Sequence, residues 1–132
     1  MASSNLHIVV VTTLVVVASM HFSTTTAATS YLVGGANGWH LPSNPHHYEE
    51  WAKGKKFVKG DQFFFIYKKE EHNVAYVKRK EDFDKCNITA VDYVYKSGGV
   101  PSWIFNEVEI VYFICTIHCA KGQKVVIDVK AS

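Results

Sequence analysis

The chain has 132 residues, of which 48% are hydrophobic and 14% aromatic, which suffices for one domain with a packed core and excludes a disordered protein. A formal net charge of +2 argues against a protein that binds nucleic acid by neutralising many phosphates. The basic residues cluster in residues 53–59, 68–69 and 78–80. We interpret these clusters as a solvated face, because acidic side chains lie among them: Glu70, Glu71, Glu81 and Asp82.

The N-terminus predicts a secretory signal peptide. Residues 1–28 contain no Lys, Arg, Asp or Glu, and the largely apolar segment from Ile8 to Met20 is too short to span a bilayer comfortably. Thr26-Ala27-Ala28 offers small side chains for cleavage after Ala27 or Ala28. We expect residues 29–132 to form one secreted domain without a lipid anchor, since no hydrophobic tail closes the chain. An uncleaved membrane anchor is the alternative, because no Lys or Arg precedes the apolar segment.

The rest of the chain alternates short strand patterns with turn signals. In chain order we expect strands at residues 31–33, 62–67, 73–77, 93–95, 103–105, 108–115 and 124–129. Short helical turns are expected at residues 46–53 and 81–85, and loops or turns at residues 34–45 and 59–61. Long helical periodicity is absent. The pattern predicts an all-β antiparallel sandwich with Greek-key connections, with these side chains in its core: Trp39, Trp51, Phe63, Phe65 and Trp103. Tyr67 lies on the same strand face as Phe63 and Phe65.

Cysteine and histidine residues gather at the ends of two predicted strands. Cys115 and His118 follow one strand, and His72 precedes another. Two imidazoles and a thiolate, with a weak axial donor, are the ligands of a blue copper site. Secretion favours disulfides, and three cysteines leave one thiol for a metal, a second chain or a buried apolar position.

Two other readings of these residues are weaker. A tetrahedral zinc site would take Cys86, Cys115, His118 and Cys119. His118 and Cys119 are adjacent in the chain, which is an awkward geometry for two ligands of one ion, and the thiols of a secreted protein tend to oxidise. A Cys–His nucleophile would need an orienting third residue and a substrate cleft, neither of which the sequence indicates, so we expect no enzyme.

The order of motifs along the chain resembles a phytocyanin, the plant branch of the cupredoxins. The resemblance rests on Tyr31-Leu32-Val33-Gly34-Gly35, Gly38-Trp39, Trp51-Ala52, Gly54-Lys55, Phe57, Gly60-Asp61, His72-Asn73-Val74, Cys86, Tyr112-Phe113-Ile114-Cys115, His118-Cys119 and Gly122-Gln123-Lys124. It implies a cupredoxin-like Greek-key β-sandwich with one or two short helical turns.

The resemblance also implies roles for individual residues. His72, Cys115 and His118 match the three strong copper ligands, and Gln123 matches the axial position, as in stellacyanin-like members. The two remaining cysteines, Cys86 and Cys119, match the family's disulfide. Asn73 matches a residue that braces the copper loop by hydrogen bonding.

One departure from the family concerns the ligand loop. Only Thr116 and Ile117 separate Cys115 from His118, where the family usually has four residues. Either the loop contracts and the site survives, or copper binding is weakened or lost. If copper binding is lost, His72 is a surface residue, Cys115 an inert buried thiol and Gln123 a solvent-facing strand residue.

The expected protein is a secreted electron carrier with one type 1 copper ion, located in the apoplast or cell wall. Its partners would be small redox molecules or a redox protein, with no nucleic acid, and it would be a monomer. The alternative is a copper-free extracellular binding or structural module. Asn87-Ile88-Thr89 is the only N-glycosylation sequon, which agrees with secretion. We expect His40, His46 and His47 to be exposed in a polar loop, without a metal role.

Overall fold

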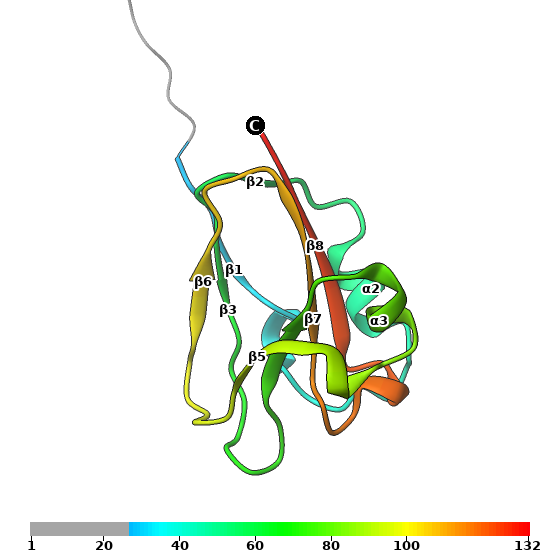
Figure 1. Ribbon diagram of the computed structural model, residues 1–132. Helices are drawn as coiled ribbons and strands as arrows, with labels where there is room; N and C mark the ends of the chain where they lie inside the picture. Colours follow the sequence, from blue (N-terminus) through cyan, green and yellow to red (C-terminus); the bar gives the residue numbers. More distant parts are fainter. Residues whose placement is uncertain (1–26) are drawn as a thin grey trace, which may run out of the picture.

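Two β-sheets face each other in a sandwich (Figure 1), as seen in a computed structural model that describes residues 27–132. The smaller sheet has the strand order β1 (Ser30–Leu32), β3 (Gln62–Phe64) and β6 (Ser102–Ile104). The larger sheet has the order β2 (Phe57–Val58), β8 (Lys124–Lys130), β7 (Glu109–Ile114), β4 (Val74–Val77) and β5 (Val91–Tyr95). The predicted all-β sandwich is therefore confirmed. Most of the predicted signal peptide, residues 1–26, lies outside the described residues.

The helical segments are short and lie outside the sheets. They comprise α2 (His47–Ala52), α3 (Lys80–Asp84) and the 3-10 turns η1 (Gly35–Asn37), η2 (Ile88–Ala90) and η3 (Cys119–Lys121). The two predicted helical turns correspond to α2 and α3. Across residues 27–132, no helix has the length and apolar character needed to cross a membrane.

The prediction that the strands pair only in antiparallel fashion is wrong at two places. β1 pairs with β3 in parallel, and β2 pairs with β8 in parallel. Parallel neighbours require a long crossover connection, and the sequence separations of both pairs supply one. The predicted strand 62–67 is also shorter, since β3 ends at Phe64. Beyond it, Phe65 N–H bonds Pro101 O at 3.0 Å and Tyr67 forms an isolated bridge with Gly99.

Aromatic side chains fill the space between the sheets. Phe63, Phe65 and Tyr67 are buried, as their alternation predicts. The Phe65 ring lies 5.0 Å from Trp39 and 4.9 Å from Phe113, between centroids, so it joins the smaller sheet to the larger one. Burial of such a side chain contributes about 1.5–3 kcal/mol. Trp51 and Trp103 are only partly buried and pack at the margin of this core.

The antiparallel ladders of the larger sheet bring two distant segments together. Ala75 of β4 pairs with Ile114 of β7, so the residues before β4 lie beside the residues after β7. β8 runs from this end of the sandwich to the opposite end, where the C-terminus lies (Figure 1). Ala27 and Ser132 both line one hollow there. The sheet thus separates the Cys–His segment from both ends of the described chain.

Candidate metal centre

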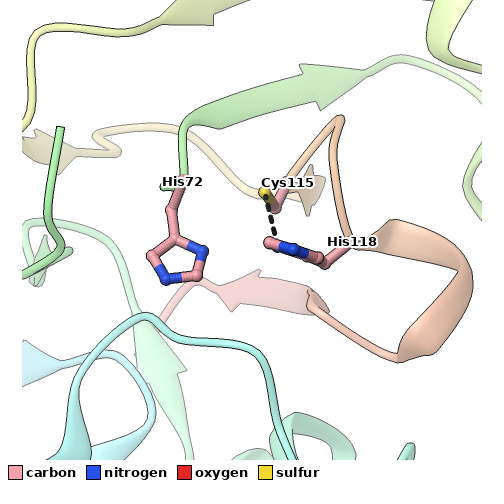
Figure 2. A group of neighbouring side chains, drawn as sticks. All are labelled: His72, Cys115 and His118. Atoms are coloured by element: carbon pink, nitrogen blue, oxygen red, sulfur yellow. Dashed lines mark hydrogen bonds between the residues drawn. The ribbon is translucent and has the colours of Figure 1, made fainter. Parts of the chain in front are cut away.

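Three potential metal ligands meet where β4 begins and β7 ends. His72 precedes β4, while Cys115 and His118 lie in the connection from β7 to β8 (Figure 2). One ligand atom from each of these residues lies within 4.8 Å of the other two. Cys115 Sγ is 3.9 Å from His118 Nδ1, and the imidazole rings of His72 and His118 are 5.2 Å apart between centroids. This spacing leaves one shared position that all three donors face.

The donor groups are largely shielded from water. Cys115 is fully buried and is the free cysteine of the described chain, while the His72 side chain is 11% exposed. Burial lowers the pKa of His72 below its usual value, and the neighbouring His118 imidazole lowers it further. Both effects favour a neutral His72 ring that carries a free lone pair. The reading of His72 as an ordinary surface residue is therefore wrong.

An unpartnered atom of His72 tests whether the site fits a metal. Within residues 27–132, His72 Nδ1 is buried and has no hydrogen-bond partner. Burial of a polar atom without a partner costs free energy, about 1–3 kcal/mol. A cation at the shared position would accept this lone pair together with the soft sulfur of Cys115. The donor set therefore fits a type 1 copper site.

Gln123 lies beside the three potential ligands. Its side chain is fully buried, so the alternative of a solvent-facing residue is wrong. Gln123 Oε1 lies 3.1 Å from His118 Nδ1. Its Nε2 has no partner in the described part of the chain. An amide oxygen in this position suits the weak axial donor of a blue copper site.

Asn73 joins the two segments that carry the ligands. Its Nδ2 donates to Thr116 Oγ1 at 2.7 Å, and its Oδ1 accepts from Thr116 N–H at 2.9 Å. Trp39 Nε1–H donates to Asn73 O at 2.8 Å. The brace expected at Asn73 is therefore present. Sequence reasoning missed Thr116 and Trp39 as its partners; the Ala75–Ile114 register, extended by two residues, pairs position 73 with position 116.

A disulfide joins Cys86 to Cys119, with Cα atoms 5.7 Å apart. The pairing implied by the family resemblance is confirmed, and the zinc site that would use both sulfurs as ligands is wrong. Cys119 directly follows His118, so the bridge ties the ligand loop to the segment after α3. In the chain-entropy view, such a bridge stabilises the fold by about 2–4 kcal/mol.

The two-residue connection between Cys115 and His118 keeps the potential ligand atoms of both residues close to that of His72. His118 O accepts from Lys121 N–H at 3.0 Å and from Gln123 N–H at 3.2 Å. Cys115 N–H donates to Gln123 O at 2.9 Å. These bonds close the loop into a compact turn, from which Ile117 projects with 55% of its surface exposed.

Other predicted residues lie apart from this group. The Asn87 side chain is half-buried, accepting from Thr89 Oγ1 at 2.7 Å and donating to Asp82 Oδ1 at 3.0 Å, and its glycosylation stays a prediction. His46 is exposed as expected. The same expectation is wrong for His40 and His47, which are half-buried because their rings pack against Tyr48.

A β-sandwich that holds two imidazoles, one thiol and one amide at the end of its larger sheet has the architecture of a cupredoxin. The comparisons with known proteins agree. A sequence family described as plastocyanin-like domain matches residues 39–123. Cucumber peeling cupredoxin from Cucumis sativus is 36% identical over 107 residues, which cover 80% of this chain and 78% of the relative.

One solved structure and one longer relative are also similar to this chain. A solved structure of cucumber stellacyanin with Cu²⁺ is 36% identical, has a TM-score of 0.75, and is matched over 81% of this chain and 99% of that one. Early nodulin-like protein 9 from Arabidopsis thaliana is 33% identical over 106 residues, which cover 79% of this chain and 51% of the relative. The chain thus spans about half of that relative's length. The chain belongs to the plastocyanin-like domain family, and within it to the phytocyanins.

Proposed function

We propose that this protein is a secreted type 1 copper protein that carries single electrons. His72, Cys115 and His118 are the strong ligands, and Gln123 is the axial ligand. The observation that carries the proposal is the meeting of one ligand atom from each of these three residues within 4.8 Å. The buried Nδ1 of His72, which has no hydrogen-bond partner in residues 27–132, supports it. Bound copper supplies the one-electron change between Cu(II) and Cu(I).

The chain's own residues limit rearrangement around the metal position. Asn73 holds the segment before β4 against the segment after β7, and the disulfide holds the residue after His118. Because the ligands are fixed by packed β-strands, their geometry changes little between the two redox states. Little reorganisation means a low barrier to electron transfer.

His118 is the proposed exit for electrons. It lies in the connection between β7 and β8, is partly exposed, and is preceded by the exposed side chain of Ile117. A small redox molecule or a redox protein would approach the site at this connection. In this role the protein exchanges electrons with its partner and catalyses no reaction of its own.

The proposed location is the apoplast or cell wall. Residues 1–28 would direct secretion, and residues 29–132 would form the mature domain. The disulfide supports this proposal, because such bonds persist in oxidising compartments. Glycosylation at Asn87 is proposed on the same grounds.

A copper titration of the expressed domain, residues 29–132, tests the function. We expect an intense blue thiolate-to-copper absorption band and an axial electron spin resonance signal on addition of one equivalent of Cu(II). Cys115→Ser should abolish the band without unfolding the domain, since Cys86 and Cys119 stay paired. Ile117→Ala is the matched control in the same loop, and it should remain blue.

The competing function is a copper-free extracellular module, which the two-residue spacing between Cys115 and His118 favours. A folded but colourless wild-type domain after copper addition would reject electron transfer and support this alternative.

A further inference from the structure

A second pair of histidines lies outside the proposed copper site. His40 follows Trp39 in the segment between η1 and α2, and His47 is the first residue of α2. Their ring centroids are 5.3 Å apart with an interplanar angle of 70°. The proposed copper ligands His72 and His118 are 5.2 Å apart with an angle of 57°. The second pair therefore has nearly the same ring separation as the proposed copper ligands.

Hydrogen bonding prepares His40 as a ligand. Its Nδ1 lies 3.1 Å from Gly38 O and 3.3 Å from the Tyr48 hydroxyl. A carbonyl oxygen can only accept, so the bond to Gly38 O requires the tautomer that carries the proton on Nδ1. This leaves the lone pair on Nε2. Metal-binding histidines commonly donate their other ring N–H to a backbone carbonyl, which fixes both the tautomer and the ring orientation.

Tyr48 holds the backbone of His40 in place. The Tyr48 hydroxyl accepts from His40 N–H at 2.8 Å, and it lies 2.9 Å from His40 O and 3.1 Å from Gly38 O, to which it can donate. Burial raises the pKa of Tyr48 to about 12, so the hydroxyl keeps its proton for these bonds at neutral pH. The position of His40 thus does not depend on its own side chain.

His47 has a buried nitrogen without a partner. In residues 27–132, three buried side-chain nitrogen or oxygen atoms lack a hydrogen bond, and two of them, His72 Nδ1 and Gln123 Nε2, belong to the proposed copper site. The third is His47 Nε2. Packing of the His47 ring against Tyr48 accounts for the ring position and leaves this nitrogen unsatisfied. A cation bound between the two rings would satisfy it.

We propose that His40 and His47 form a second metal site, which binds a borderline divalent cation such as Zn²⁺ through the Nε2 atoms of both rings. Imidazole nitrogen is a preferred donor for such ions, and water completes the coordination. The site is independent of the proposed function, because it shares no ligand with the copper site and involves no redox change.

A zinc titration of the copper-loaded, tag-free domain tests this site. We expect one equivalent of Zn²⁺ to bind by isothermal titration calorimetry, with the copper absorption band retained. In long-range ¹H–¹⁵N spectra the Nε2 resonances of His40 and His47 should shift on binding. His40→Ala and His47→Gln should each weaken zinc binding by at least about tenfold.

Two controls separate this site from its neighbours. His46→Ala removes an exposed imidazole whose Nδ1 lies 3.3 Å from Glu49, and zinc binding should be unchanged. The titration is repeated on the variant with both His72→Ala and Cys115→Ser, which disables the first site, so the result does not depend on copper loading. Absence of zinc binding by folded protein, or binding that survives the combined loss of His40 and His47, would overturn the proposal.

Discussion

At the scale of single residues, Gln123 is the proposed axial ligand of the copper site. Its oxygen lies 3.1 Å from His118 Nδ1, in a fully buried position. An amide oxygen is a harder donor than a thioether and stabilises Cu(II) more, so the axial ligand tunes the reduction potential. We predict that Gln123→Met raises the potential, measured by protein-film voltammetry. Ile117→Ala, which leaves the donors unchanged, is the control, and equal potentials for the wild type and Gln123→Met would reject the axial role.

Asn73 should affect both folding and metal affinity. Asn73→Ala removes two hydrogen bonds to Thr116, each worth about 0.5–1.5 kcal/mol. We predict a loss of about 1–3 kcal/mol in the free energy of unfolding by urea, and about 10–100-fold weaker copper binding. Thr116→Val keeps the backbone bond and removes only the hydroxyl bond, so its effects should be roughly half as large. Equal copper affinity in Asn73→Ala and the wild type would show that the brace does not position the ligands.

The sequence predicts the ligand residues of the proposed copper site better than the residues that hold them in place by hydrogen bonds. Ligand residues carry chemistry that few other side chains can supply, so Cys115 and His118 are recognisable from type and order. Trp39 and Thr116 act through single hydrogen bonds, which many residues could make and which depend on strand register. The half-buried state of His40 was also unpredictable, because it follows from a tertiary contact with Tyr48.

At the scale of elements, strand positions were predictable and strand partners were not. The alternation of Phe63, Phe65 and Tyr67 reveals a buried face, but alternation carries no information on whether a neighbour runs parallel. The pairing of β1 with β3 depends on where the intervening segment returns to the sheet. The strand predicted over residues 62–67 ends earlier than expected, because Phe65 N–H bonds the loop residue Pro101 and not a residue of a neighbouring strand.

The segment between η1 and α2 depends on a glycine. Gly38 has φ of +68°, and a Cβ there would lie 2.8 Å from Ile66 O. We predict that Gly38→Ala destabilises the fold by more than Gly54→Ala, where φ is +80° and no atom lies within 4 Å. Gly54→Ala should cost only the left-handed backbone penalty, about 1–2 kcal/mol. Thermal and urea unfolding of both variants measure the difference, and equal losses would show that the contact with Ile66 is not limiting.

At the scale of the whole molecule, the disulfide connects the ligand loop to the rest of the fold. We predict that Cys86→Ala combined with Cys119→Ala lowers the free energy of unfolding by about 2–4 kcal/mol, because the unfolded chain gains entropy. Urea unfolding of the metal-free protein measures this effect. Cys115→Ser is the matched control, since it removes a buried thiol and keeps the bridge. If Cys115→Ser lowered the free energy of unfolding as much as the double variant does, the disulfide would make no particular contribution to stability.

The positions of Ala27 and Ser132 have a practical consequence. Both residues line one hollow. The C-terminus lies at the end of the sandwich opposite the β7–β8 connection (Figure 1). A tether attached at Ser132 would therefore leave His118 facing away from the surface to which the protein is fixed. Immobilisation on an electrode through this end should slow direct electron exchange, whereas attachment near Ile117 should favour it. The point of attachment thus determines whether the proposed copper site faces the electrode or faces away from it.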